Sequence, residues 1–176
     1  LIGLSGGIDS ALTLAVAVDA IGSENVHAVM MPYEFTSNMS LEDSALQARN
    51  QGVEFSNIDI HSMVDSFNNS LNDLFGNAKV DSTEENIQAR VRGTLLMALS
   101  NKHHKIVLAT GNKSEMAVGY ATLYGDMCGG FAPLKDISKT MVYKLSNYRN
   151  SISKVIPERV ITRPPSAELA PNQEDQ

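Results

Sequence analysis

The sequence predicts an α/β fold in which helices cover both faces of a doubly wound, mostly parallel sheet. Apolar runs of strand length alternate along the chain with segments of helical length. These helical segments are long enough to carry the chain back across a sheet, as parallel pairing requires. Hydrophobic side chains make up 43 % and charged side chains 19 % of the 176 residues, which is typical of a globular chain.

Residues 1–60 predict three strands separated by two helices. The strands are expected at 1–4, 27–32 and 53–60, and the helices at 11–21 and 40–52. Gly22 and Gly52 stand where each of these helices should end. Ser40, three residues before the acidic Asp43, has the position of a helix-capping residue.

The rest of the chain predicts three further helices and one further strand. The helices are expected at 62–75, 82–103 and 138–148, the strand at 105–110, and an irregular Gly-rich stretch at 119–133. Ser82, three residues before Glu85, is a second helix-start signature, and Gly111 ends the strand. Ligands of open α/β sheets bind beyond the carboxyl ends of the strands, so the site is expected at residues 5–10 and 110–115.

The length is that of one domain, which we expect to cover residues 1–169 and to be followed by a polar tail over 170–176. The apolar residues 1–4 have the character of a strand that began earlier. The last residues carry no periodic pattern. We therefore expect a domain that is truncated at both ends and belongs to a longer polypeptide.

Composition excludes several classes of protein. The chain has 14 Lys and Arg residues against 20 Asp and Glu residues, a net charge of -6. This balance argues against nucleic acid or an anionic membrane as a partner. The single cysteine, Cys128, cannot form an internal disulfide, and no apolar run reaches the roughly 18–20 residues that span a bilayer. We therefore expect a cytoplasmic protein.

The segment between the first strand and the first helix is typical of an anion-binding loop. It consists of Ser5, Gly6, Gly7, Ile8, Asp9 and Ser10. Adjacent glycines let the backbone turn tightly, and the N–H groups at a helix start attract phosphate. Asp9 would repel phosphate unless a cation lay between them, which predicts a Mg²⁺ ligand. The alternative is an ordinary Gly-Gly turn in which Asp9 or Ser10 caps the helix.

This loop resembles the pyrophosphate-binding PP-loop of the N-type ATP pyrophosphatases. No lysine follows the glycines, which separates it from the loop of the P-loop NTPases. The resemblance implies the adenine nucleotide alpha hydrolase-like fold. It also implies that ATP is cleaved between its α and β phosphates, that the substrate is adenylylated, and that a nitrogen or sulfur nucleophile displaces AMP.

Three later segments narrow the resemblance to the NAD synthetases. These segments are residues 110–115, 119–126 and 133–140. The synthetase domain of the glutamine-dependent type is the most similar variant. The resemblance implies a ligase that converts deamido-NAD to NAD with ATP and ammonia and releases AMP and pyrophosphate. It further implies an amidohydrolase domain that supplies the ammonia from glutamine, and a homodimer or larger homo-oligomer.

The resemblance also assigns roles to individual residues. The implied ATP-binding residues are Gly3, Leu4, Ser5, Gly6, Gly7, Ile8, Asp9, Ser10, Thr110, Lys139 and Ser166. The implied deamido-NAD-binding residues are Asn86, Arg90, Glu115, Tyr124 and Asp126. Asp9 and Glu115 match Mg²⁺-binding positions, and together with Lys139 they form the implied catalytic set.

Other interpretations of these residues stay open. Arg90 could be an ordinary solvated residue on the polar face of a helix. Glu115 could be an acidic residue that the helix dipole favours in a first turn, and Lys139 could be an ordinary surface lysine. Another PP-loop ligase that amidates or thiolates its substrate would share residues 5–10 but not residues 110–126. A nucleotide-binding module that is inactive as an isolated fragment is the third possibility.

Overall fold

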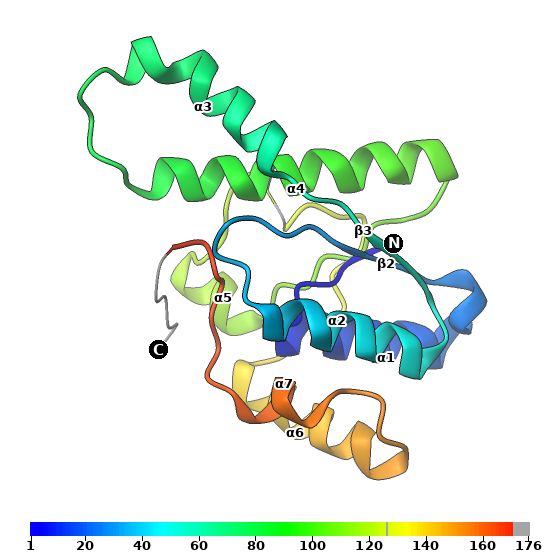
Figure 1. Cartoon of the computed structure of the whole chain (residues 1–176). Helices are drawn as coiled ribbons and strands as arrows, with labels where there is room; N and C mark the ends of the chain where they lie inside the picture. Colours follow the sequence, from blue (N-terminus) through cyan, green and yellow to red (C-terminus); the bar gives the residue numbers. More distant parts are fainter. Residues whose placement is uncertain (126, 171–176) are drawn as a thin grey trace.

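The computed structural model describes residues 1–125 and 127–170 (Figure 1). The strands are β1 (Ile2–Gly3), β2 (His27–Met30) and β3 (Glu54–Asn57). The helices are α1 (Ile8–Ile21), the short η1 (Ser23–Asn25), α2 (Asn38–Gln51), α3 (His61–Phe75), α4 (Ser82–His103), α5 (Lys113–Val118), α6 (Lys139–Ile152) and α7 (Glu158–Thr162). The strands form one parallel sheet in the order β1-β2-β3, which confirms the predicted fold class.

Two single-residue bridges extend the sheet beyond β1. Leu108 pairs in parallel with Ile2, and Phe131 pairs in parallel with Leu108. The prediction of a continuous strand over 105–110 is therefore wrong in extent. The cause is the short edge offered by β1, which covers only Ile2–Gly3 before the chain turns away.

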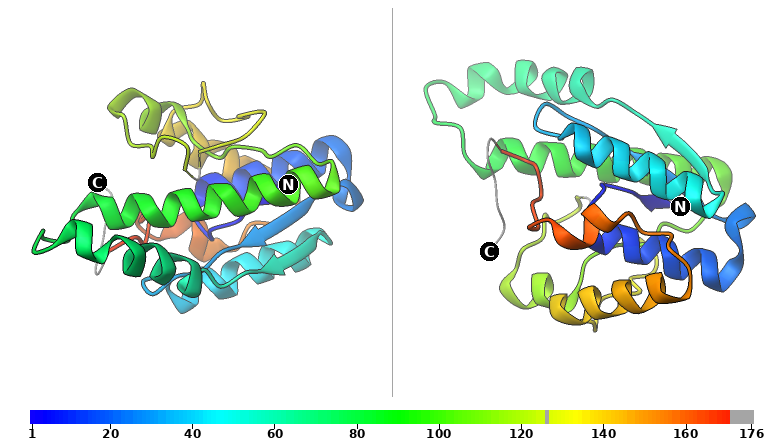
Figure 2. Two further views of the ribbon diagram at one scale, coloured as in Figure 1. Left: turned by 90° about the horizontal axis from the view of Figure 1, so that it is seen from above. Right: turned by 60° about the horizontal axis from the view of Figure 1, so that its bottom comes forward.

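Helices cover both faces of the sheet (Figures 1 and 2). On one face, alternate strand residues pack against α1 in a cluster formed by Ile2, Leu4, Leu14, Ala17, Val26 and Ala28. On the other face, the intervening strand residues pack against α3 and α4 in a cluster that contains Leu1, Val29, Met31, Val64, Val91 and Leu96. Successive side chains of a strand point to opposite faces, so cover on both sides explains why β2 is buried at all four positions, whereas the edge strand β3 carries polar side chains and is partly exposed.

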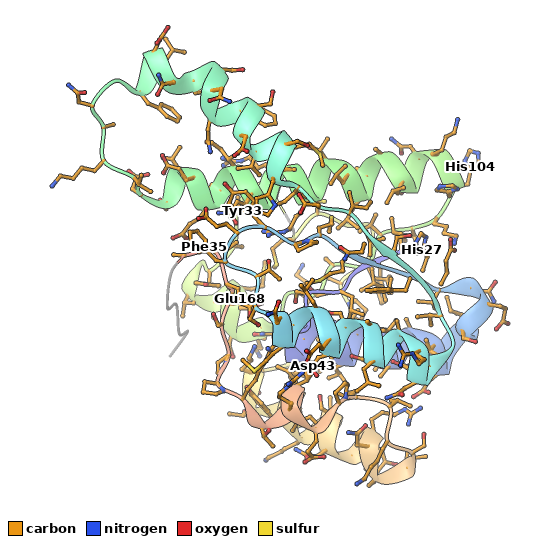
Figure 3. The ribbon with its side chains drawn as sticks, in the orientation of Figure 1. His27, Tyr33, Phe35, Asp43, His104 and Glu168 are labelled. Carbon is orange, nitrogen blue, oxygen red and sulfur yellow. The ribbon has the colours of Figure 1, made fainter. Side chains whose placement is uncertain are left out.

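Helix α7 is fastened to α2 by an ion pair. Arg159 donates from Nε to Asp43 Oδ2 and from Nη2 to Asp43 Oδ1, each over 3.0 Å. The Asp43 side chain is buried between the two helices (Figure 3). The hydrogen bonds that Arg159 donates to Asp43 and then to Glu42 raise the pKa of Arg159 above its already high range, so the pair stays charged. The chain that follows α7 therefore starts from a fixed point beside α2.

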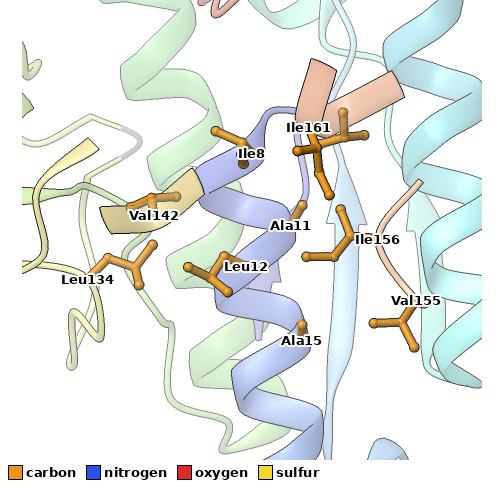
Figure 4. Close-up of a cluster of buried hydrophobic side chains, with 10 residues drawn as sticks. Ile8, Ala11, Leu12, Ala15, Leu134, Val142, Val155, Ile156 and Ile161 are labelled. Carbon is orange, nitrogen blue, oxygen red and sulfur yellow. The ribbon is translucent and has the colours of Figure 1, made fainter. Parts of the chain in front are cut away.

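A third apolar cluster packs α6 and α7 against the outer side of α1 (Figure 4). Its members are Ile8, Ala11, Leu12, Ala15, Leu134, Val142, Val155, Ile156, Val160 and Ile161. Val142 in α6 is completely buried. This packing brings the first turn of α6 next to the first turn of α1, and it thereby positions two charged residues of the site.

Helices α1 and α2 begin before the predicted residue, whereas α4 begins at Ser82 as predicted and differs only in its capping residue. Helix α1 begins at Ile8, so the last three residues of the predicted loop form its first turn. Helix α2 is capped by Ser37, whose side chain accepts from Ser40 N, and α4 is capped by Asp81 in a capping box with Glu84. The capping residues of α2 and α4 were mistaken for the same reason: several Ser, Asp and Glu residues stand close together, and only the backbone decides which one caps. The short helices α5 and α7 were not predicted.

The predicted polar tail over 170–176 lies, apart from Ala170, outside the described residues, and so does Asp126. Among the helices of residues 1–125 and 127–170, none combines the length and the apolar character needed to cross a lipid bilayer.

Candidate functional site

A cavity of about 450 Å³ lies beyond the carboxyl end of β1. From β1 the strand order runs through β2 to β3, whereas Leu108 adds to the opposite side of β1. Such a reversal opens a crevice between the loops that leave neighbouring strands, and ligands of α/β sheets bind there. The cavity is lined by these predicted site residues: Gly3, Leu4, Ser5, Gly7, Ile8, Asp9, Ser10, Asn86, Thr110, Glu115, Lys139 and Ser166.

The phosphate loop, residues 5–10, turns sharply between β1 and α1. Gly6 has a φ of 80°, in the left-handed region, and a Cβ there would lie 2.7 Å from the carbonyl oxygen of Ser40. Ser5 N donates to Ser10 Oγ, and Gly7 N donates to Ser5 Oγ, each over 3.2 Å. Among the described residues no side chain caps α1. The first N–H groups of this helix therefore face the cavity as donors for an anion.

One lysine links the starts of three helices. Lys139, the first residue of α6, forms an ion pair through Nζ with Asp9 Oδ2 in the first turn of α1. The same Nζ atom lies 3.9 Å from Glu115 Oε1 in α5. These side chains are only 15–26 % exposed, so water screens their charges weakly. Two carboxylates share one ammonium, and the centre keeps an excess of negative charge.

Asn112 holds both carboxylates in place. This completely buried residue caps α5: its Oδ1 accepts from Glu115 N over 3.0 Å, and its own N–H donates to Glu115 Oε2 over 3.1 Å. The side-chain amide nitrogen of Asn112, Nδ2, donates to Asp9 Oδ1 over 2.8 Å. Lys139 is fixed through its backbone, since its N–H donates to Ser114 Oγ over 3.0 Å. The charged centre is therefore ordered by the fold before any ligand binds.

Asp9 and Glu115 are oxygen donors of the kind that Mg²⁺ prefers. Within residues 1–125 and 127–170, no group of three or more His, Cys, Asp or Glu side chains forms a metal cage. Mg²⁺ is commonly held by one or two carboxylates together with phosphate oxygens of a substrate. The excess negative charge at Asp9 and Glu115 fits that mode, in which the ligand supplies the remaining oxygens.

The segment 163–169, called the strap below, follows α7 and lines the cavity. Ser166, a predicted site residue, lies in the middle of the strap. Its Oγ accepts from Glu168 N over 3.1 Å. The strap thus forms one wall of the cavity, although it follows the phosphate loop by more than 150 residues in the sequence. It contacts the loop where Arg163 donates to the Gly6 carbonyl oxygen.

Three predicted residues that the structure describes lie outside the cavity lining. Gly6 is covered by Ser40. Arg90 is exposed and donates from Nε to the Leu123 carbonyl oxygen over 3.3 Å. Tyr124 is 81 % exposed and lines a second cavity of about 430 Å³ next to Leu123.

Asn86 and Arg90 share a helical face, as their spacing predicts, and this face is turned to residues 119–125. Asn86 Oδ1 accepts from Thr122 Oγ1 over 2.7 Å. Their roles in binding a dinucleotide stay predictions, as does the role of Asp126.

The sequence was also compared with known proteins. The NAD synthase family model matches residues 1–176. The chain belongs to the NAD synthase family. The glutamine-dependent NAD(+) synthetase of Acinetobacter baylyi is 65 % identical over 178 residues, which cover 100 % of this chain and 33 % of that protein. The chain therefore spans about a third of the length of this curated relative.

Two solved structures of NAD synthase relatives resemble the chain. Glutamine-dependent NAD+ synthetase from Acinetobacter baumannii, in complex with ADP, superposes with a TM-score of 0.91 at 64 % identity, covering 96 % of this chain and 32 % of that one. NMN synthetase from Francisella tularensis superposes with a TM-score of 0.88 at 28 % identity, covering 99 % of this chain and 68 % of that one. The expected family is thereby confirmed.

Four residues of the site in this NAD synthase family member were not predicted. They are Arg92, Asn112, Arg163 and Glu168. Asn112 had a local signal, because an Asn three residues before Glu115 forms a capping pattern. Arg92 donates from Nε to the Met31 carbonyl oxygen over 3.0 Å and lines the cavity, but its sequence position does not separate it from the neighbouring exposed Arg90. The contacts of the strap residues are long-range and carry no local signal.

Proposed function

We propose that this chain forms the ATP-dependent amidating part of a glutamine-dependent NAD synthetase. The reaction joins deamido-NAD, ATP and ammonia into NAD, AMP and pyrophosphate. The observation that supports it most is the ordered centre of Asp9, Lys139 and Glu115 beside the phosphate loop. Ammonia would come from glutamine through an amidohydrolase part of the same enzyme.

The reaction has two steps that suit this arrangement. An oxygen of the nicotinate carboxylate attacks the α-phosphorus of ATP, and the bond from that phosphorus to the bridging oxygen breaks, so pyrophosphate leaves. Ammonia then attacks the carboxyl carbon, AMP leaves with its oxygen, and one proton is released. Charge grows on the leaving pyrophosphate in the first step. The N–H groups at the start of α1 and the ammonium of Lys139 are fixed donors for that charge.

Asp9 and Glu115 would hold the Mg²⁺ that accompanies ATP. The metal supplies positive charge that offsets the triphosphate. Asn112 keeps both carboxylates oriented, and Lys139 is able to exchange its contact with Asp9 for a phosphate oxygen. Thr110 and Ser166 also line the cavity and add hydroxyl groups to it. Catalysis then rests mainly on holding two nucleotides end to end.

The deamido-NAD end of the site would lie toward α4 and residues 119–125. Asn86 lines the cavity there, Arg90 lies on the same face of α4 beside Leu123, and Tyr124 follows Leu123 on the exposed surface. A dinucleotide is long enough to extend from the cavity over this exposed surface. We also keep the prediction of a homodimer or larger homo-oligomer, which light scattering on the purified protein tests.

An assay of AMP and pyrophosphate release tests the proposal. The purified protein is mixed with ATP, Mg²⁺ and ammonium, and with deamido-NAD, nicotinate mononucleotide or xanthosine monophosphate. Turnover with deamido-NAD supports the proposal. Preference for the mononucleotide would favour the activity named for the Francisella relative, and turnover with xanthosine monophosphate would favour another PP-loop ligase. Stabilisation by MgATP without any turnover would favour a nucleotide-binding module.

A further inference from the structure

The strap is fastened to the start of α2 by one carboxylate. Glu168 Oε1 accepts from Ser37 Oγ over 2.7 Å and from Ser40 Oγ over 2.8 Å, and Oε2 accepts from Ser37 N over 3.1 Å. Figure 3 shows Glu168 beside the first turn of α2. Negative charge at a helix N-terminus is favourable, and hydrogen bonds to a charged group are strong. Glu168 therefore holds the strap at a defined place.

The same contact reaches the phosphate loop through an arginine. Arg163 Nη2 donates to the carbonyl oxygen of Gly6 and, over 3.0 Å, to Ser40 Oγ. Arg163 Nη1 lies 4.0 Å from Glu168 Oε1. Ser40 is completely buried and lies under Gly6, where it leaves no room for a Cβ. Glu168, Ser40 and Arg163 thus form a continuous chain of contacts from α2 to the Gly6 carbonyl.

We propose that Glu168 and Arg163 are positioning residues that fix the phosphate loop in its anion-binding shape before nucleotide arrives. This inference rests on the proposed function, because it assigns the loop to a triphosphate or pyrophosphate. Gly6 and Gly7 have more backbone freedom than any other residue type, so an untethered loop loses the most entropy on binding. Holding the Gly6 carbonyl sets the orientation of the Gly6–Gly7 peptide and removes part of that cost.

The sign of the effect distinguishes this role from simple electrostatics. Glu168 lines the cavity, so by charge alone its carboxylate weakens the binding of an anion, and its removal should tighten binding. The positioning role predicts the opposite result. Glu168→Ala should weaken MgATP binding by about tenfold, because preorganisation of the loop is lost.

The test measures dissociation constants for MgATP and for magnesium pyrophosphate by calorimetry. Glu168→Ala should weaken both by a similar factor. Glu168→Gln keeps one acceptor oxygen for the two serine hydroxyls and should fall between wild type and Glu168→Ala. In the assay, Glu168→Ala should raise the KM for ATP and leave the KM for deamido-NAD within about twofold, since only the loop is disturbed.

Arg149→Ala is the matched control. Arg149, in α6, forms a bidentate ion pair with Asp19, which lies in α1 at the end far from the phosphate loop. This variant should lose some thermal stability and keep the wild-type affinity for MgATP. If Glu168→Ala does not fold, Ser40→Ala removes the hydroxyl between Glu168 and Arg163 and should weaken MgATP binding in the same direction.

Two results would overturn the inference. MgATP binding to folded Glu168→Ala that equals or exceeds wild-type binding, with the wild type binding normally, would remove the positioning role alone. Absence of MgATP and magnesium pyrophosphate binding in the wild-type protein would remove the proposed function and the positioning role together.

Discussion

The ammonium group of Lys139 is ion-paired with the carboxylate of Asp9, although 130 positions separate the two residues in the chain. Each lies in the first turn of a helix, Asp9 in α1 and Lys139 in α6. The helix dipole disfavours a cation at a helix N-terminus, so Lys139 does not stabilise α6 by its position. The pair forms because α6 packs along α1, and it places a cation next to the phosphate loop.

Asp9→Asn should lower kcat/KM by about 100-fold or more, because it removes a charge that holds both Lys139 and the proposed Mg²⁺. Turnover measured across a Mg²⁺ titration checks this result. Asp19→Asn is the same substitution in α1, in an exposed ion pair with Arg149, and should leave the rate near wild type. A wild-type rate in Asp9→Asn would rule out the metal role.

Gly6→Ala should destabilise the protein and abolish MgATP binding. The left-handed φ costs an alanine about 1–2 kcal/mol, and the new Cβ would also meet the Ser40 carbonyl oxygen at 2.7 Å. Gly52→Ala is the control, because Gly52 has a left-handed φ of 65° and only Ser23 Oγ, at 3.9 Å, lies within 4 Å of its Cβ position. Urea unfolding should show a larger loss for Gly6→Ala, and equal losses would contradict the clash.

Asn112→Asp should lower kcat/KM by about tenfold or more and keep the fold, because Asp is also a good helix cap. The new carboxylate would face Asp9 Oδ1, where the amide now donates over 2.8 Å. Asn112→Ser also keeps a capping oxygen but adds no charge. Steady-state kinetics should show a smaller loss for Asn112→Ser, and the argument from charge fails if the two losses are equal.

Arg90→Ala should raise the KM for deamido-NAD more than the KM for ATP, since Arg90 lies on the face of α4 turned to residues 119–125 and away from the phosphate loop. Lys102→Ala, an exposed cation near the other end of α4, serves as the control and should change neither KM. Separate titrations of the two substrates measure the split. Equal effects of Arg90→Ala on both substrates would count against the assignment.

His27 should make stability depend on pH. Burial lowers the pKa of His27, although Glu54, 3.5 Å from Nδ1, partly opposes the shift. The unfolded chain therefore binds a proton more readily than the folded chain does. The contribution of His27 to stability is complete above its ordinary pKa of 6.5, and it is lost as the pH falls through the lower pKa of the folded state. Thermal unfolding of His27→Asn from pH 7.5 to 5 should show a flatter profile than wild type, and parallel profiles would refute the assignment.

Local patterns were enough to predict the layered α/β architecture. Strand and helix periods repeat within a few residues, and the Gly6-Gly7 turn between β1 and α1 is a local feature, so both are visible without a structure. The rule that ligands bind beyond strand ends then brings residues 5–10 and 110–115 to one cavity. Boundaries were less certain where capping residues crowd together, as at Ser37 and Ser40.

The sequence by itself thus determined the fold class, the family and the loop that faces the cavity, because each depends on residues close together in the chain. Only the tertiary structure decided which side chains support that loop. Asn112 and Lys139 meet Asp9, and Glu168 reaches α2, through packing between segments more than 100 positions apart. Contacts of this kind depend on how helices pack against one another, and no local period or spacing encodes them.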